Sequence, residues 1–197
     1  MERATEVLDK HDADAQEAGL DVHYVFSPTQ RALVHLAAGE YEEALAQAGE
    51  ATARGKSTGL EGAAELALRR NVELISAIAE ARLGRVEAAE ARIPFLEQEM
   101  EKAPQMVNAV QIARGVVAMA KGENESAVGA FSKCEPRAAL CAWQLAEARD
   151  LAGDAEGADA AWAHLRELRL RDGFYLVLWA KAGAHATPPD PAALVSE

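Results

Sequence analysis

Three adjacent residues have the types that end a phosphate-binding loop. Gly55, Lys56 and Ser57 match the last positions of the pattern G-x-x-x-x-G-K-S. The pattern also requires a glycine five places before Gly55, where the chain has Glu50, and a strand before the loop, which the sequence does not predict. We therefore interpret the three residues as a helix end followed by a turn.

Acidic residues and one histidine near the N-terminus have types that ligate metals: Asp9, His11, Asp12 and Asp14. At helical spacing His11 and Asp12 point in different directions, and the other histidines form no i, i+4 pairs. A solvated helix face explains this group better. Since no nucleophile and base stand in a recognisable order either, the sequence predicts no metal, no cofactor and no enzymatic activity.

The two cysteines, Cys134 and Cys141, flank Glu135 and Pro136 at a junction between helices, where they could come close. Free cysteine behaves as a small hydrophobic residue and is common in protein interiors. We therefore favour buried, reduced thiols over a disulfide. The sequence leaves open whether the two residues pair.

The composition favours helices and an acidic surface. The chain has 197 residues, abundant alanine and only 5% aromatic residues, which is typical of closely packed helices. Its formal net charge is −12, and such a field repels nucleic-acid phosphates. The sequence has no apolar run near the roughly 20 residues that span a bilayer and no signal-peptide core. We expect a cytoplasmic protein that binds neither nucleic acid nor membranes.

Apolar periodicity and the positions of glycine and proline predict helices along nearly the whole chain. Residues 21–28 are predicted to connect the first two helices, and residues 186–197 to form a flexible tail because they are rich in proline. The predicted helices cover residues 1–18, 29–38, 41–54, 60–83, 86–102, 105–121, 124–134, 137–152, 155–170 and 172–183.

One motif recurs four times: a glycine that closes a helix, followed five places later by an alanine. The glycines are Gly39, Gly84, Gly122 and Gly153. Glycine readily adopts the left-handed conformation that closes a helix. A recurring unit of this size indicates stacked pairs of helices.

These residues resemble the tetratricopeptide repeat, a unit of about 34 residues that forms two antiparallel helices. The family also has a small residue seven places before the glycine and a bulky apolar residue nine places after it. The small residue lets two helices approach, and the bulky one fills the gap to the next pair. The small residues are Ala32, Ala77, Gly115 and Ala146. The position of the bulky residue holds Ile93, Phe131 and Trp162 in three repeats and the smaller Ala48 in the first.

The resemblance covers about residues 25–170 and implies an all-α fold, a right-handed α–α superhelix built as a solenoid of antiparallel helix hairpins. We expect one domain over residues 1–185, with about four repeats and flanking helices. The motif glycines are 45, 38 and 31 residues apart. The repeats are therefore irregular, and we expect a bend near residues 55–62.

The resemblance further implies that the first helices of the repeats line a concave groove for a partner. That surface is mainly apolar and suits an amphipathic helix or an extended apolar segment. It lacks the lysine and asparagine with which some members bind an acidic chain terminus. The alternative, which we weigh equally, is that the apolar residues simply pack against neighbouring helices. The residues expected in the groove are Leu33, Leu74, Ile78, Ile112, Val116, Met119 and Trp143 for apolar contact, and Asn71, Arg82, Glu147 and Asp150 for orientation.

Residues 174–180 are a second unusual stretch, because all seven are apolar. A helix that is apolar all round is expected to be buried, so we favour docking on the preceding hairpin. The alternative is a contact with another chain, including a second copy of this one. The residues of this second candidate interface are Phe174, Tyr175, Leu178 and Trp179.

The sequence therefore predicts a non-catalytic scaffold that presents a largely apolar groove to a peptide or helix of a partner protein. A first alternative is a regulatory or sensory repeat segment of a larger protein, such as a bacterial kinase or transcription regulator, with the groove occupied in cis. A second alternative, an enzyme on a helical-repeat scaffold, is disfavoured because no acid, base, nucleophile or metal set converges.

Overall fold

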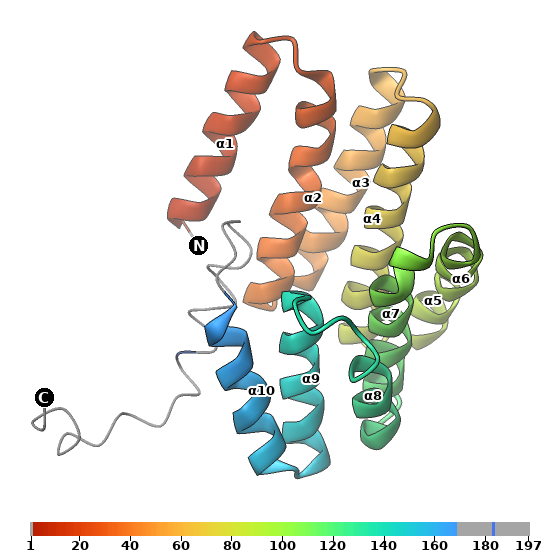
Figure 1. The fold of residues 1–197 in the computed structure, drawn as a ribbon. Helices are drawn as coiled ribbons and strands as arrows, with labels where there is room; N and C mark the ends of the chain where they lie inside the picture. Colours follow the sequence, from red (N-terminus) through yellow and green to blue (C-terminus); the bar gives the residue numbers. More distant parts are fainter. Residues whose placement is uncertain (1, 169–182, 184–197) are drawn as a thin grey trace, which may run out of the picture.

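Helices form all the regular secondary structure in the part of the chain that the structure describes, residues 2–168 and residue 183. The structure is a computed structural model (Figure 1). The predicted all-α fold is confirmed for these residues. The elements are α1 (Glu2–Glu17), α2 (Asp21–Ala38), α3 (Tyr41–Ser57), α4 (Gly62–Arg82), α5 (Val86–Glu90), α6 (Ile93–Lys102), the 3-10 turn η1 (Pro104–Met106), α7 (Val107–Ala120), α8 (Asn124–Phe131), α9 (Ala139–Ala152) and α10 (Ala155–Glu167).

The motif glycines end helices as predicted. Gly39 follows α2 and Gly153 follows α9, both in the left-handed conformation, with φ of 82° and 78°. The N–H of Gly39 donates to Leu36 O at 3.1 Å, and the N–H of Glu40 donates to His35 O at 2.9 Å. Residues with a Cβ rarely adopt this conformation. These glycines therefore fix where the chain turns from one helix to the next.

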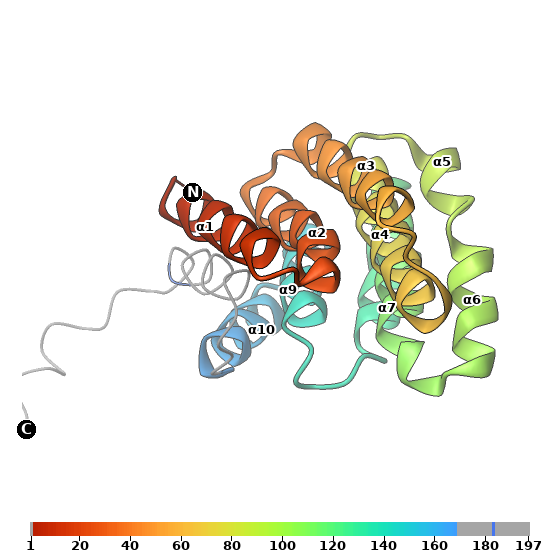
Figure 2. The ribbon, with the colours of Figure 1, turned by 90° about the horizontal axis from the view of Figure 1, so that it is seen from above.

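Successive helices pack as pairs. α2 lies against α3, α7 against α8 and α9 against α10, whereas α4 lies against both α5 and α6. Viewed from above, α2, α4, α7 and α9 lie toward the centre, with α3, α5 and α6 outside them (Figure 2). The small residues of the repeated motif are all buried, as their predicted role between packed helices requires: Ala32, Ala77, Gly115, Ala146, Ala44, Ala89, Ala127 and Ala158.

The helix α2 is longer than predicted, because residues 21–28 continue the helix instead of forming a connection. Pro28 lies inside α2 and has no N–H to donate to the carbonyl of Tyr24, four residues earlier. Arg54 of α3 supplies that donor, since its Nη1 donates to Tyr24 O at 3.0 Å. The helix passes through a proline because a side chain of the neighbouring helix satisfies the freed carbonyl.

The single helix predicted over residues 86–102 is divided in two. α5 ends at Glu90, and α6 begins at Ile93 with Pro94 in its first turn. Pro94 cannot donate to the carbonyl of Glu90, so a continuous helix would leave that carbonyl unpaired. The break lets α6 pack against α7 as well as α4.

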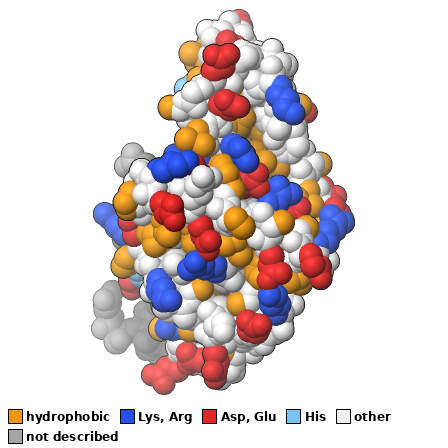
Figure 3. Space-filling view, turned by 90° about the vertical axis from the view of Figure 1, so that its right-hand side faces the viewer, with side chains coloured by type: hydrophobic (Ala, Val, Ile, Leu, Met, Phe, Trp, Pro, Cys, Tyr) orange, Lys and Arg blue, Asp and Glu red, His pale blue; other side chains and the backbone are white. Residues whose placement is uncertain are grey.

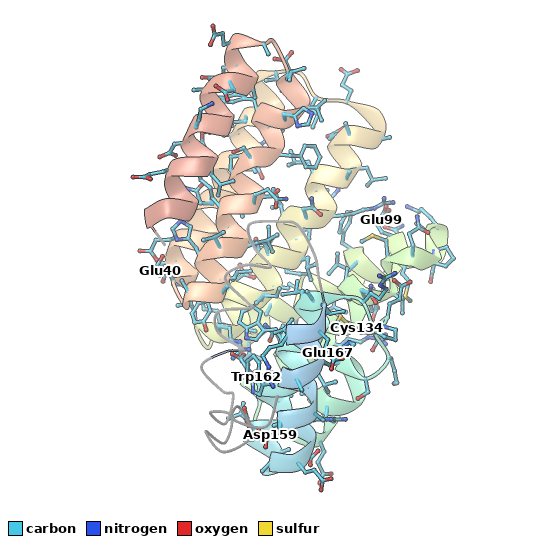
Figure 4. All side chains as sticks on the ribbon, turned by 60° about the vertical axis from the view of Figure 1, so that its left-hand side comes forward. Glu40, Glu99, Cys134, Asp159, Trp162 and Glu167 are labelled. Atoms are coloured by element: carbon cyan, nitrogen blue, oxygen red, sulfur yellow. A yellow bond between two sulfur atoms is a disulfide. The ribbon has the colours of Figure 1, made fainter. Side chains whose placement is uncertain are left out.

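Cys134 and Cys141 form a disulfide, which corrects the expectation of reduced thiols. α8 ends earlier and α9 begins later than predicted, so a connection of several residues lies between them. This connection brings the two Cα atoms within 6.3 Å, inside the range that a disulfide spans. Cys134 lies in the connection (Figure 4). Cys141 is in the first turn of α9.

The main apolar core is built from several helix pairs. Leu36 of α2, Ile78 of α4, Val116 of α7 and Trp162 of α10 belong to one buried cluster. Outside the core, acidic and basic side chains alternate over the face formed by α4, α5 and α6 (Figure 3). Arg92, for example, binds Glu80 at 2.7 Å on this side of the molecule.

Several predictions concern residues outside the described part of the chain. The flexible tail at 186–197 and the second candidate interface, with Phe174, Tyr175, Leu178 and Trp179, lie there. The single domain over 1–185 stays a prediction for the same reason. Within the described part, no helix combines the length and apolar character that crossing a membrane requires.

Candidate binding groove

The predicted groove is closed along part of its length. Ile78 of α4, Val116 of α7 and Trp143 of α9 are fully buried in the main core. Ile112 of α7 is 2% exposed and belongs to the same core. For Ile78, Val116 and Trp143 the packing alternative holds, because a partner has no access to them in this structure. Ile112 reaches the surface only at the cavity described below.

The polar residues at the closed end bind other parts of the protein. Arg82 of α4 donates from Nη2 to Oε1 of Gln144 at 2.6 Å and to Oε2 of Glu147, both on α9. The indole N–H of Trp143 donates to Oε1 of Glu147 at 2.7 Å. Arg82 and Glu147 were expected to orient a partner, and they instead connect α4 with α9.

This polar network lies inside the protein. Gln144 is fully buried, and its Nε2 and the Nε of Arg82 have no hydrogen-bond partner within the described residues. Tyr41 of α3 lies near the same ion pair. Burial raises the pKa of its phenol; the charge of Arg82 lowers that pKa and the charge of Glu147 raises it, and the net pKa lies above the ordinary value. The network is therefore a structural link between helices that do not otherwise pack closely.

Three further predicted groove residues have contacts within the protein. Leu33 of α2 and Met119 of α7 are half-buried and pack against the main core. Asp150 of α9 is exposed and accepts a hydrogen bond at 3.2 Å from the indole N–H of Trp162 on α10. Leu33 and Met119 thus contribute to core packing, and Asp150 connects α9 with α10.

The other part of the predicted groove is open. Asn71 and Leu74 of α4, Ile112 of α7 and Leu140 of α9 line a cavity of about 410 Å³. Asn71 is exposed, whereas Leu74 is half-buried. The volume lies within the range of about 300–1,000 Å³ that is typical of binding pockets. The structure thus brings together three of the predicted residues at one cavity, which we call the α4/α7/α9 cavity.

Part of the cavity wall comes from residues that sequence reasoning did not identify. Arg70 lies within α4, and the others lie at or beside connections between helix pairs: Gln105, Met106, Asn108, Arg137, Ala138 and Ala139. The resemblance assigns groove positions only within the first helices, so it carries no signal for connections. The position of Pro136 before Arg137 indicates a turn but not which cavity the turn borders.

Two arginines stand at the cavity, and one is already neutralised. Arg70 donates from Nε and Nη2 to Glu99 of α6 at 3.0 and 2.6 Å. Glu99 also accepts from Lys102 at 2.9 Å (Figure 4). Hydrogen bonds from Lys102 and Arg70 lower the pKa of the Glu99 carboxyl below its ordinary value, against the effect of burial. Arg137, by contrast, is exposed.

The phosphate-loop candidate is a helix end, as interpreted from the sequence. Gly55 lies in the last turn of α3 and is buried, and a Cβ on it would lie 2.7 Å from Cδ2 of Leu68 on α4. The hydroxyl of Ser57 donates to Arg54 O at 3.0 Å. Glycine at position 55 therefore serves the close approach of α3 and α4.

The acidic residues near the N-terminus bind arginines. Asp9 and Asp12 of α1 accept from Arg31 of α2 at 2.8 and 2.7 Å, and Asp12 also accepts from Arg54 at 3.0 Å. A polar cavity of about 500 Å³ lies beside Asp9, Arg31 and Arg54, and both of its arginines are compensated by carboxylates. Among the described residues, no three His, Cys, Asp or Glu side chains gather as a metal site would require.

Comparison with known proteins found no match to a family model, to a curated protein or to a solved structure.

Proposed function

We propose that this protein is a non-catalytic interaction scaffold that binds a segment of a partner protein in the α4/α7/α9 cavity. The observation that carries the proposal is the convergence of Asn71, Leu74 and Ile112 on one open cavity between first helices of three successive pairs. An apolar floor with a few polar groups at its edge is the usual character of a binding site.

We also propose that the helix pairs form a tetratricopeptide-like superhelix. The order of contacts supports this, because α2 touches α4, α4 touches α7 and α7 touches α9. The left-handed glycines and the buried small residues at matching positions in each pair support it too. In such a stack the first helices line the inner surface, and residues of three of these helices line the cavity.

The test is to fill the cavity without disturbing the core. Substituting Ile112 or Val116 by aspartate would unfold the protein, because both side chains are buried and a buried charge is costly. Asn71→Trp places a large ring at the cavity edge from an exposed position. Affinity capture from the source cell, followed by calorimetry with the purified partner, should show binding weakened about tenfold or more.

The matched control is Gln98→Trp, which makes the same kind of change at an exposed position of α6 that does not line the cavity. Both variants should keep the wild-type circular dichroism and unfolding midpoint. A partner that binds Asn71→Trp as tightly as wild type would exclude the cavity as its site.

A cytoplasmic location is likewise a proposal, and cell fractionation makes it testable. Disulfides are rare in the reducing cytosol, so the bond between Cys134 and Cys141 counts against this location. The proposal predicts that the protein is recovered with cytosolic marker proteins when source cells are fractionated. Recovery with secreted or periplasmic markers would contradict it.

A further inference from the structure

The charge at the edge of the α4/α7/α9 cavity indicates what kind of segment it binds. Of the two arginines that line the cavity, Arg70 is bound by Glu99. Arg137 is exposed, and among the described residues its guanidinium has no ion-pair or hydrogen-bond partner. The cavity edge therefore carries one uncompensated positive charge beside an apolar floor.

The connection that carries Arg137 is anchored on both sides. The disulfide between Cys134 and Cys141 closes it, and the backbone N–H of Glu135 donates to Oδ1 of Asn108 at 2.9 Å. The ring of His164 on α10 contacts the carbonyl oxygen of Pro136 at 2.5 Å. Arg137 thus projects from a short, restrained segment, which lowers the backbone entropy lost when this connection binds a partner.

The negative charge of the rest of the protein makes Arg137 a favourable site for an acidic side chain. The formal net charge of the chain is −12, so its field disfavours acidic segments over most of the surface. An acidic side chain gains binding energy only where a local cation is free to pair with it. A guanidinium presents parallel N–H groups that match a carboxylate, and such a pair is stronger than a neutral hydrogen bond.

We propose that the α4/α7/α9 cavity selects a segment of a partner protein that combines large apolar side chains with an aspartate or glutamate, which pairs with Arg137. The apolar side chains cover Leu74, Ile112 and Leu140, and the carboxylate lies over the α8–α9 connection. The inference rests on the proposed function and adds the chemistry of the partner.

The experiment is selection from a random dodecapeptide display library on the immobilised full chain. The arms are wild type, Arg137→Glu and the control Lys133→Glu, which makes the same charge change at an exposed position of the same connection that does not line the cavity. Wild type and Lys133→Glu should enrich peptides with large apolar residues and Asp or Glu. Those peptides, synthesised and titrated, should bind Arg137→Glu about tenfold or more weakly, as expected for loss of a charge-assisted pair.

Reversing the charge on the peptide sharpens the test. Peptides with their acidic residue changed to lysine should bind Arg137→Glu more tightly than wild type. Peptides that Asn71→Trp blocks, but that show no preference for acidic residues and no sensitivity to Arg137→Glu, would overturn the inference while leaving the proposed function intact. If no selected peptide is sensitive to Asn71→Trp, the proposed function itself is wrong.

Discussion

At the scale of single residues, small side chains decide how closely the helices approach. Gly115 of α7 faces the ring of Phe131 on α8, and a Cβ on Gly115 would overlap that ring. The glycine lies inside a helix, where it costs about 1 kcal/mol relative to alanine. The close packing of the Phe131 ring, which is 2% exposed, offsets this cost.

We therefore expect Gly115→Ala to destabilise the protein by about 1–3 kcal/mol, because the added methyl overpacks a filled site. Gly129→Ala on α8 is the matched control, since nothing lies within 4 Å of a Cβ there. It should raise the free energy of unfolding by roughly 0.5–1 kcal/mol through helix propensity alone.

Urea unfolding of the two variants provides the measurement. Adding Phe131→Leu to Gly115→Ala should recover part of the loss by vacating the ring position. Equal effects of the two glycine substitutions would show that Gly115 has no special packing role.

At the scale of elements, α1 is attached through charges as well as apolar contacts. The carboxylate of Asp12 is only 13% exposed and binds Arg31 of α2 and Arg54 of α3. Burial raises the pKa of Asp12, whereas the neighbouring Ser27 hydroxyl and the two guanidinium groups lower it. The net pKa lies below the ordinary value, so folding favours the charged form.

The lowered pKa of Asp12 determines how the free energy of unfolding changes with pH. A carboxyl with a lowered pKa in the folded state stabilises the fold above its unfolded pKa, about 4, and loses that contribution as the pH falls through the folded value. We expect protection of α1 from amide hydrogen exchange to decline as the pH is lowered below about 4.

Two substitutions separate this effect from general acid unfolding. Asp12→Asn should weaken α1 protection at neutral pH and flatten its acid dependence. Asp14→Asn should change little, because Asp14 is exposed and pairs only with Lys10 on the same helix among described residues. An unchanged acid profile in Asp12→Asn would show that α1 is held by other contacts.

The disulfide between Cys134 and Cys141 restrains the α8–α9 connection. The disulfide closes a loop with a sequence separation of 7 residues. We expect Cys134→Ser/Cys141→Ser to lower the free energy of unfolding by about 2 kcal/mol, chiefly because the unfolded chain regains freedom.

A reducing agent provides the check on this prediction. Reduction should lower the free energy of unfolding of wild type to that of the double variant, and it should not change the value for the variant. Native wild-type protein that already reacts with thiol reagents would show that the bond does not form.

At the scale of the whole molecule, one polar network ties the second helix pair to the fourth. Arg82 and Glu147 are 65 residues apart in the sequence, and their side chains are 20% and 18% exposed. The bond spans from α4 to α9 past α7, and Trp143 donates to the same carboxylate. This contact closes one end of the predicted groove and leaves the α4/α7/α9 cavity at the other.

We expect Arg82→Met to destabilise the protein by about 3 kcal/mol, because it leaves the Glu147 carboxylate largely buried without its cation. Chemical unfolding gives the value, with Arg85→Met as control. Arg85 pairs with Glu42 on the surface, where side chains are about half exposed, and should cost less than about 1 kcal/mol. Similar losses in both variants would show that the α4–α9 contact adds nothing beyond a surface ion pair.

The sequence by itself determined the features that depend on local chemistry. Glycines that close helices and alanines buried between helices follow from backbone conformations and side-chain sizes within a few residues. That is why Gly39 and Gly153 were identified correctly, together with the buried position of Ala146. The interpretation of Gly55 to Ser57 as a helix end rests on the same local reasoning.

The tertiary structure alone decided which surfaces are open and which polar groups meet. Trp143 and Leu74 both belong to helices that are predicted to line the groove, yet Trp143 is buried and Leu74 borders a cavity. Pro28 leaves the carbonyl of Tyr24 without its helical donor, and Arg54, 30 positions after Tyr24, donates to it. Contacts between residues so distant in the sequence depend on how all the helices pack together, and periodicity along one helix carries no information about that packing.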